Sequence, residues 1–146
     1  MAKWGKVDYE QFIKLQKKLQ QLEKIDRDQF CRDVAKELAA RLLAKVIKRT
    51  PVGEYPPQSG VMGGTLRRGW TAEQITKIGN IYQIEIINPV HYASYVEYGH
   101  RTRDHKGWVE GRFMLTISEQ ELNERAPIII ERKLEQLLKG LFEGGK

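Results

Sequence analysis

The side chains best suited to metal binding or proton transfer lie within one short stretch of this chain. They are His91, Glu97, His100, Asp104, His105 and Glu110. Their spacing matches no zinc pattern, such as two histidines one helical turn apart. A thiolate ligand is also out of reach, because the single Cys31 stands far upstream. We therefore expect these histidines to be solvated or hydrogen-bonded, and we predict no metal site.

Covalent catalysis and phosphate binding find equally little support in the sequence. The chain has three serines: Ser59, Ser94 and Ser118. None lies in a nucleophile elbow, which needs a serine on a strand-to-helix turn with flanking glycines. Gly60, Gly63 and Gly64 precede a Thr-Leu-Arg-Arg segment, but the spacing is not that of a P-loop. We predict neither an enzyme nor a cofactor. We interpret these glycines as residues that keep a loop flexible enough to become ordered when it binds a partner.

Binding is better supported than catalysis, because arginines and aromatic residues alternate in the loop-like parts of the chain. These residues are Arg67, Arg68, Arg101, Arg103, Lys106 and Arg112, together with Tyr55, Trp70, Tyr98 and Trp108. Such surfaces can stack nucleic-acid bases, but the same residue types also dominate protein interfaces. No established nucleic-acid-binding motif is present. The residues alone leave both kinds of partner open.

Composition sets wider bounds on the class of protein. A length of 146 residues fits one domain, residues 1–146, with a core of its own. The net charge of +6 permits an acidic partner without requiring one, since many basic residues sit beside acids on helix-like faces. One cysteine excludes an internal disulfide framework. No stretch could span a bilayer, and Met1–Lys6 lacks the apolar core of a signal peptide, so we expect synthesis in a cytoplasm.

Two helices are predicted to open the chain. Within residues 1–25, a narrow seam of Phe12, Leu15, Leu19 and Leu22 indicates a peripheral helix that packs on its own domain or on a neighbouring subunit. A second helix begins at a capping box of Asp26 and Gln29. Its broad apolar stripe runs from Phe30 to Ile47 and contains Cys31 as a buried or half-buried residue. It ends at Arg49–Thr50, because the residue before Pro51 avoids the α region.

The middle of the chain is predicted to form loops and a hairpin. Residues 51–69 are rich in proline and glycine, so we expect a long functional or mobile loop. Residues 70–78 and 81–87 are typical of strands joined by a Gly79–Asn80 hairpin turn. Residues 92–99 suit a short helix stopped by glycine, although a strand is an alternative.

The last third is expected to end in a long helix. Residues 100–112 are predicted to be a long loop or an extended hairpin arm, and residues 113–117 a short strand or extended core segment. Ser118 and Glu121 form a second capping-box pattern at the start of a C-terminal helix. Pro127 either kinks this helix or marks the start of its main body. Gly144–Lys146 is expected to be a frayed end.

The order of these segments resembles the gp-ten-like family of minor tail components from long-tailed phages and prophages. The matching pieces are Thr50-Pro51-Val52, then Gly64-Thr65-Leu66-Arg67-Arg68-Gly69-Trp70, then Tyr92-Ala93-Ser94-Tyr95-Val96-Glu97-Tyr98-Gly99, and finally Gly111-Arg112-Phe113-Met114. The resemblance covers most of the chain from about Phe30 onward. The family often carries a proline where this chain has Arg112, and the Pro56–Pro57 loop is longer than usual.

The resemblance implies an α+β fold, with amphipathic helices packed on a small antiparallel sheet that contains a β-hairpin and long loops. It also implies a tail-completion, neck or head–tail joining protein that assembles into a ring, commonly hexameric. Expected partners are other copies of the chain and the tail-tube, tail-terminator or connector proteins of the virion. A small basic nucleic-acid-binding module is the alternative; no membrane partner is expected.

On this hypothesis the two long loops, residues 51–69 and 100–112, carry the contacts with neighbouring subunits or with the tail tube. The candidate interface residues are Arg67, Arg68, Trp70, Glu97, Tyr98, Arg101, Arg103 and Trp108. Glu97 has an alternative role as a structural acid that pairs with a nearby arginine.

Overall fold

The computed structural model describes residues 9–23 and 26–143. Within helix α1 the side chains of Tyr9, Gln11, Phe12 and Leu22 are also outside the description. Two predictions, the absence of a signal peptide at Met1–Lys6 and the frayed end at Gly144–Lys146, therefore lie outside the described residues.

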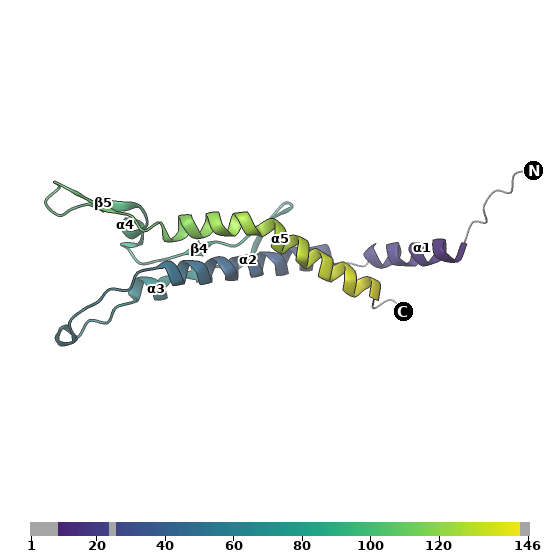
Figure 1. Ribbon diagram of the computed structural model, residues 1–146, viewed down its shortest axis with the longest axis horizontal. Helices are drawn as coiled ribbons and strands as arrows, with labels where there is room; N and C mark the ends of the chain where they lie inside the picture. The colour runs from purple at the N-terminus through teal and green to yellow at the C-terminus, as the bar shows by residue number, and fades with distance from the viewer. Residues whose placement is uncertain (1–8, 24–25, 144–146) are drawn as a thin grey trace, which may run out of the picture.

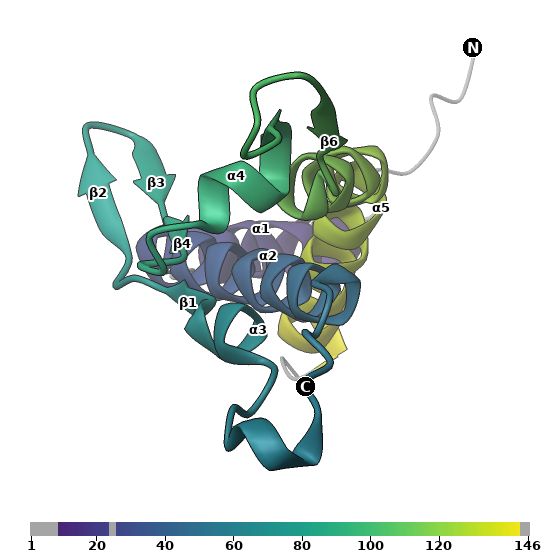
Figure 2. The same cartoon turned by 90° about the vertical axis from the view of Figure 1, so that its left-hand side faces the viewer.

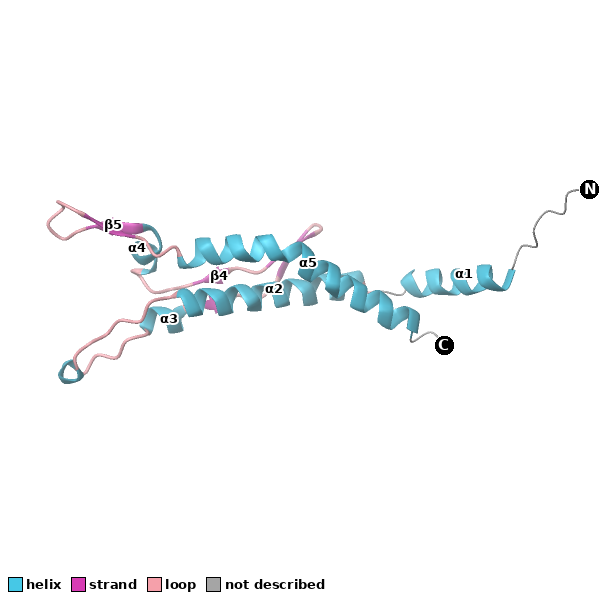
Figure 3. Cartoon of the chain, viewed as in Figure 1, coloured by secondary structure: helices cyan, strands magenta, loops and turns pink. Residues whose placement is uncertain are grey.

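Helices make up most of the structure (Figure 3). They are α1 (Tyr9–Glu23), α2 (Arg27–Arg49), the 3₁₀ helix η1 (Pro57–Ser59), α3 (Thr65–Gly69), α4 (Ala93–Tyr98) and α5 (Met114–Glu143). The strands are β1 (Thr71–Ala72), β2 (Thr76–Ile78), β3 (Ile81–Gln83), β4 (Ile86–Ile87), β5 (Gly99–Arg101) and β6 (Trp108–Glu110). Within the described residues they pair as β1–β4, β2–β3 and β5–β6, all antiparallel. The predicted α+β class is confirmed, with short two-stranded ladders in place of one sheet.

Helices α2 and α5 form the body of the molecule and run side by side in opposite directions (Figure 1). Their contact is polar along one edge: Arg49 and Lys45 of α2 both bond to Glu121 of α5. Further along, Lys133 Nζ lies 2.6 Å from Glu37 Oε2. Helix α1 extends from the far end of this body, and its Leu15 and Leu19 remain about half exposed.

The core lies where α2, α3 and α5 meet. Val46, Leu66, Trp70 and Met114 form its buried cluster. The indole Nε1 of Trp70 donates a hydrogen bond of 2.7 Å to Thr50 Oγ1, so the polar end of this large side chain is satisfied inside the protein. Trp70 is thus an anchor of the core, and not the first residue of a strand as predicted.

The start of α2 follows the sequence closely. Asp26 is its N-cap and accepts a hydrogen bond from the backbone N–H of Gln29. The return bond of a full capping box is missing, because the Gln29 side chain bonds to Asp33 instead. The helix ends at Arg49, before Thr50 and Pro51, as predicted. Cys31 is half-buried and free, also as predicted.

The predicted hairpin is present in interrupted form. Gly79, at φ +60°, and Asn80 make the turn between β2 and β3, as expected. The regular ladder is interrupted at residues 73–75 and 84–85, where the N–H of Glu73 still donates to the carbonyl of Glu85 (2.8 Å), and it resumes as β1–β4, where Thr71 faces Ile87. The helix prediction for residues 92–99 is confirmed by α4, so the strand alternative is wrong.

Two predictions about the C-terminal part need correction, and the structure selects one of the two alternatives for Pro127. Residues 113–117 are not a strand, because α5 begins at Met114. Ser118 is not a cap: it is buried inside α5, where its hydroxyl donates to the Met114 carbonyl. Pro127 lies within the helix and does not start it. The ribbon of α5 changes direction between its green first half and its yellow second half, as expected for a helix that contains a proline (Figure 1).

Candidate assembly interface

Two projections leave the body at the end opposite α1, and Figure 2 views this end directly. We call residues 99–111, which hold β5 and β6, the hairpin arm, and residues 51–64, which hold η1, the proline loop. In Figure 2 the hairpin arm lies above α2 and the proline loop lies below it. The predicted loop 51–69 is shorter than expected, because residues 65–69 form α3. Of the two alternatives for residues 100–112, the extended hairpin arm is correct.

The tip of the hairpin arm is held in one shape by its own hydrogen bonds. Thr102 Oγ1 donates to Asp104 Oδ1 at 2.5 Å and accepts from the backbone N–H of Gly107 at 3.0 Å. Asp104 also accepts from the N–H of Lys106. The hydroxyl of Thr102, and then this N–H, lower the pKa of the Asp104 carboxyl. The charge of Asp104 is satisfied within the turn, and the other exposed charges of the arm are the basic Arg101, Arg103 and Lys106 and the acidic Glu110.

The base of the arm requires two glycines. Gly99 has φ +87°, and a Cβ placed there would lie 2.4 Å from the carbonyl oxygen of Val109. A Cβ at Gly111 would lie 2.4 Å from the carbonyl oxygen of Glu97. Only glycine permits this backbone approach and this positive φ. The two glycines therefore determine where the arm leaves the body.

Glu97 joins the base of the arm to α5. Its side chain is 6% exposed, and its carboxylate accepts bonds from the backbone N–H groups of Leu115 (3.0 Å) and Thr116 (2.9 Å). The hydroxyl of Thr116 donates a third bond. These are N–H groups of the first helical turn, which have no partner within the helix itself. Glu97 is thus a structural acid, as the alternative proposed, but it caps a helix instead of pairing with an arginine.

The proline loop exposes apolar side chains on a well-defined backbone. Val52, Tyr55, Val61 and Met62 are all exposed, and Met62 is 76% exposed. The two sides of the loop pack closely: a Cβ at Gly63 would lie 1.9 Å from the carbonyl oxygen of Gly53. Between the base of this loop and α4 is a groove of about 290 Å³.

The eight candidate interface residues separate into two groups in the structure. Arg68, Tyr98, Arg101, Arg103 and Trp108 are exposed. The other three serve the fold: Trp70 and Glu97 are buried, and both the Nε and Nη2 groups of Arg67 donate to the carbonyl of Thr50. Tyr98 and Trp108 are 63% and 56% exposed. Arg101, Arg103 and Trp108 of the exposed group lie on the hairpin arm, whereas Tyr98 ends α4 just before the arm and Arg68 lies in α3 at the base of the proline loop.

Sequence reasoning missed the apolar part of this surface. The exposed residues that it did not include among the interface candidates are Val52, Val61, Met62, Tyr95 and Val109. For Val52, Val61 and Met62 the signal was present, because large apolar residues inside a proline- and glycine-rich segment have no regular element to pack them. Monomeric proteins rarely expose large apolar clusters, and such clusters mark interaction sites.

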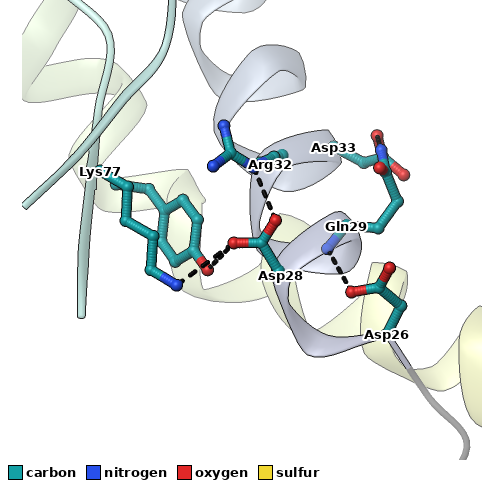
Figure 4. Close-up of polar contacts among 7 residues, drawn as sticks. Asp26, Asp28, Gln29, Arg32, Asp33 and Lys77 are labelled. Atoms are coloured by element: carbon teal, nitrogen blue, oxygen red, sulfur yellow. Dashed lines mark hydrogen bonds and ion pairs between the residues drawn. The ribbon is translucent and has the colours of Figure 1, made fainter. Parts of the chain in front are cut away.

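A polar cluster at the other end of the body has a structural role (Figure 4). Asp28, in the first turn of α2, accepts bonds from Tyr82 Oη (2.6 Å), Arg32 Nε (2.7 Å) and Lys77 Nζ (3.3 Å). The hydroxyl of Tyr82 and then the guanidinium of Arg32 hold the pKa of Asp28 well below its usual range. Since every partner is a donor and the site is open to solvent, the cluster fastens the β2–β3 hairpin to α2.

The histidines, serines and carboxylates considered as chemical groups are not brought together. His100 packs its ring against Tyr95 with centroids 5.8 Å apart, whereas His105 lies in the turn of the arm at φ 58°. Ser59 donates to the carbonyl of Pro56 within its own loop. Over residues 9–23 and 26–143, no three metal-ligating side chains gather into a group that could hold an ion. In the same residues no helix combines the length and apolar character needed to cross a bilayer.

Comparison with known proteins supplies the family. No curated protein and no solved structure matches the chain. A family model described as "Bacteriophage HK97-gp10, putative tail-component" matches residues 13–99. The match begins in α1, earlier than the resemblance seen at Phe30, and ends at Gly99, the first residue of the hairpin arm, well before α5. It covers more than half of the chain, and the chain therefore belongs to the HK97-gp10-like family of phage tail components.

Proposed function

We propose that this protein is a structural, non-enzymatic component of the phage virion that completes the tail or joins it to the head. It is made in the cytoplasm of the bacterial host and assembles into a ring, with six subunits as the expected number. Membership of a tail-component family supports the general role. The ring and the position in the neck or tail are our own inference from the two projections.

The observation that carries this proposal is the pair of projections at one end of the molecule, both of which expose large apolar side chains. An arm with a hydrogen-bonded tip loses little conformational entropy on binding, so its exposed side chains can contribute to association. Tyr98 and Trp108 are of the types that dominate binding energy when they become buried. A single domain of this size would leave such residues exposed at a cost in solubility unless a partner covers them.

The exposed members of the predicted interface, Arg68, Tyr98, Arg101, Arg103 and Trp108, are the residues we assign to contacts between subunits or with the tail tube, tail terminator or connector. Arg67, Trp70 and Glu97 would act indirectly, because they hold α3, the core and α5 in place.

The test is the mass of the purified chain by light scattering over a wide range of concentration, with negative-stain imaging of the same samples. Rings with a central opening are the expected result. If the chain is monomeric throughout, binding to neighbouring tail proteins in a pull-down would preserve the tail role and remove the self-assembled ring. Failure in both assays would overturn the proposal.

A nucleic-acid-binding role is the second candidate, favoured by the exposed Arg101 and Arg103 beside Trp108 on one arm. It predicts binding to single-stranded DNA that weakens steeply as salt is raised. A gel-shift series that shows no complex at low salt would eliminate it.

A further inference from the structure

The hairpin arm carries charge that its own molecule does not neutralise. Arg101 and Arg103 are exposed, and within the described residues neither guanidinium forms an ion pair or a side-chain hydrogen bond. Asp104, between them and Lys106, spends its oxygens on the turn, and the arm's other acid, the exposed Glu110, lies at its base in β6. The arm therefore combines unpaired arginines with the exposed indole of Trp108.

A surface of opposite charge lies on the outer side of α5. Residues separated by three or four positions share one face of a helix. The exposed residues with this spacing are Ile117, Gln120, Glu124, Ile128 and Glu131, and we call them the α5 stripe. Glu124 and Glu131 have no ion-pair partner among the described residues, and Ile128 is 52% exposed. The stripe thus combines two exposed isoleucines with two acidic side chains and one glutamine.

The rest of α5 is already used within the molecule. Met114, Ser118 and Leu122 are buried, and they step along the helix by four residues on a face next to the stripe. Glu121 is bonded to α2 through Arg49 and Lys45. The stripe is therefore an exposed flank of α5 beside the face that packs on α2.

We propose that the hairpin arm of one copy docks on the α5 stripe of a second copy, which deepens the ring assembly proposed above and depends on it. The basic arm and the acidic stripe are complementary in charge, and each supplies large apolar groups to the same contact. The arm does not reach its own stripe, because its base carries it beyond the end of α5 (Figure 1). A contact between two different surfaces of the same chain is heterologous, and it closes into a ring when the rotation permits.

The size of these surfaces predicts a weak individual contact. A large aromatic side chain buries about 150–250 Å², so side chains exposed to about half their area offer roughly 100 Å² each. A few such groups on each side fall below the ~800 Å² per partner of a stable interface. We therefore expect reversible association of the free chain that strengthens when the ring closes, and that weakens with added salt.

A charge exchange between the two surfaces tests the pairing. One variant reverses the arm, with Arg101→Glu and Arg103→Glu; a second reverses the stripe, with Glu124→Lys and Glu131→Lys. Each variant alone places like charges in the contact, so its self-association should weaken at least about tenfold. In an equal mixture, the acidic arm of the first meets the basic stripe of the second, and the native charges meet in the reciprocal contact. Light scattering should show assemblies that contain both variants in equal amounts.

The control carries a charge change of the same size at the far end of the molecule. Lys14→Glu with Lys17→Glu alters two exposed lysines of α1 and should leave association unchanged. The pairing would be overturned if the wild type associates and neither reversal weakens this association, or if the mixture stays dissociated. The proposed ring would still stand in both cases. A wild-type chain that remains monomeric at every concentration would also overturn it, whereas the tail role itself would then depend on the pull-down described above.

Discussion

Removing the carboxylate of Glu97 should destabilise the protein through the first turn of α5. Glu97→Ala deletes the three hydrogen bonds that the carboxylate accepts from the N–H groups of Leu115 and Thr116 and from the hydroxyl of Thr116. The site is 6% exposed, so water cannot replace all three partners. Loss of a single N-cap costs about 1 kcal/mol, and each hydrogen bond to a charged group is worth about 1.5–3 kcal/mol.

Because these contributions overlap, we expect Glu97→Ala to reduce the free energy of unfolding by about 3 kcal/mol. At about 2–4 °C for each kcal/mol in a chain of this size, the Tm should fall by roughly 10 °C. Glu97→Gln provides an intermediate case. Its remaining oxygen can still accept both bonds from Thr116, but its amide group would face the N–H of Leu115, and about half of the loss is expected.

Urea unfolding followed by circular dichroism measures these differences, and hydrogen exchange at the amides of Leu115 and Thr116 shows whether the helix start is affected. Glu119→Ala is the matched control, since this exposed glutamate lies in α5 close to the same turn. It should change stability by less than about 0.5 kcal/mol. Equal stability of Glu97→Ala and Glu119→Ala would refute the capping role that we derive from the geometry.

Two further predictions concern the base of the arm and the link between α2 and α5. Gly99→Ala should lower the Tm and broaden the NMR signals of the arm, because its Cβ would meet the carbonyl of Val109 at positive φ. Gly140→Ala is the comparison: this glycine has open space around it in α5, and the change should raise stability by about 0.5–1 kcal/mol. A Gly99→Ala variant more stable than Gly140→Ala would be inconsistent with the structure. Glu121, whose pKa is lowered to about 2 chiefly by Arg49, should stabilise the fold above its ordinary pKa of 4.5 and lose this contribution as the pH falls toward 2. The Tm difference between wild type and Glu121→Gln should therefore be present at pH 7 and vanish near pH 2, and a difference that persists there would contradict the pairing.

The elements that the sequence predicted well are those whose signals are local. The start of α2 at Asp26 and its end before Pro51 depend on residues within one helical turn of each boundary. The Gly79–Asn80 turn is equally local, because the positive φ of Gly79 is set by the turn itself. In each case the residue that determines the structure lies within the segment it determines.

The start of α5 was missed for the opposite reason. Phe113, Thr116 and Ile117 favour strands by propensity, and the cap that overrides this preference is Glu97, which lies 18 residues before Leu115. The Ser118–Glu121 pattern then misled, because Ser118 packs inside an existing helix and Glu121 reaches across to α2. A capping residue supplied from another element leaves no mark in the sequence around the helix it caps.

The segment Tyr95–Gly99, one of the pieces on which the family resemblance depended, has a structural explanation. Glu97 caps α5, and Gly99 allows the backbone of the arm to pass close to Gly111. These residues fix the position and direction of the hairpin arm without forming its contact surface. Beyond Gly99, where the family match ends, the arm exposes Arg101, Arg103 and Trp108. The position of these side chains depends on the base that Glu97 and Gly99 hold in place, and the partner of this chain has to be sought in the chemistry of its own arm.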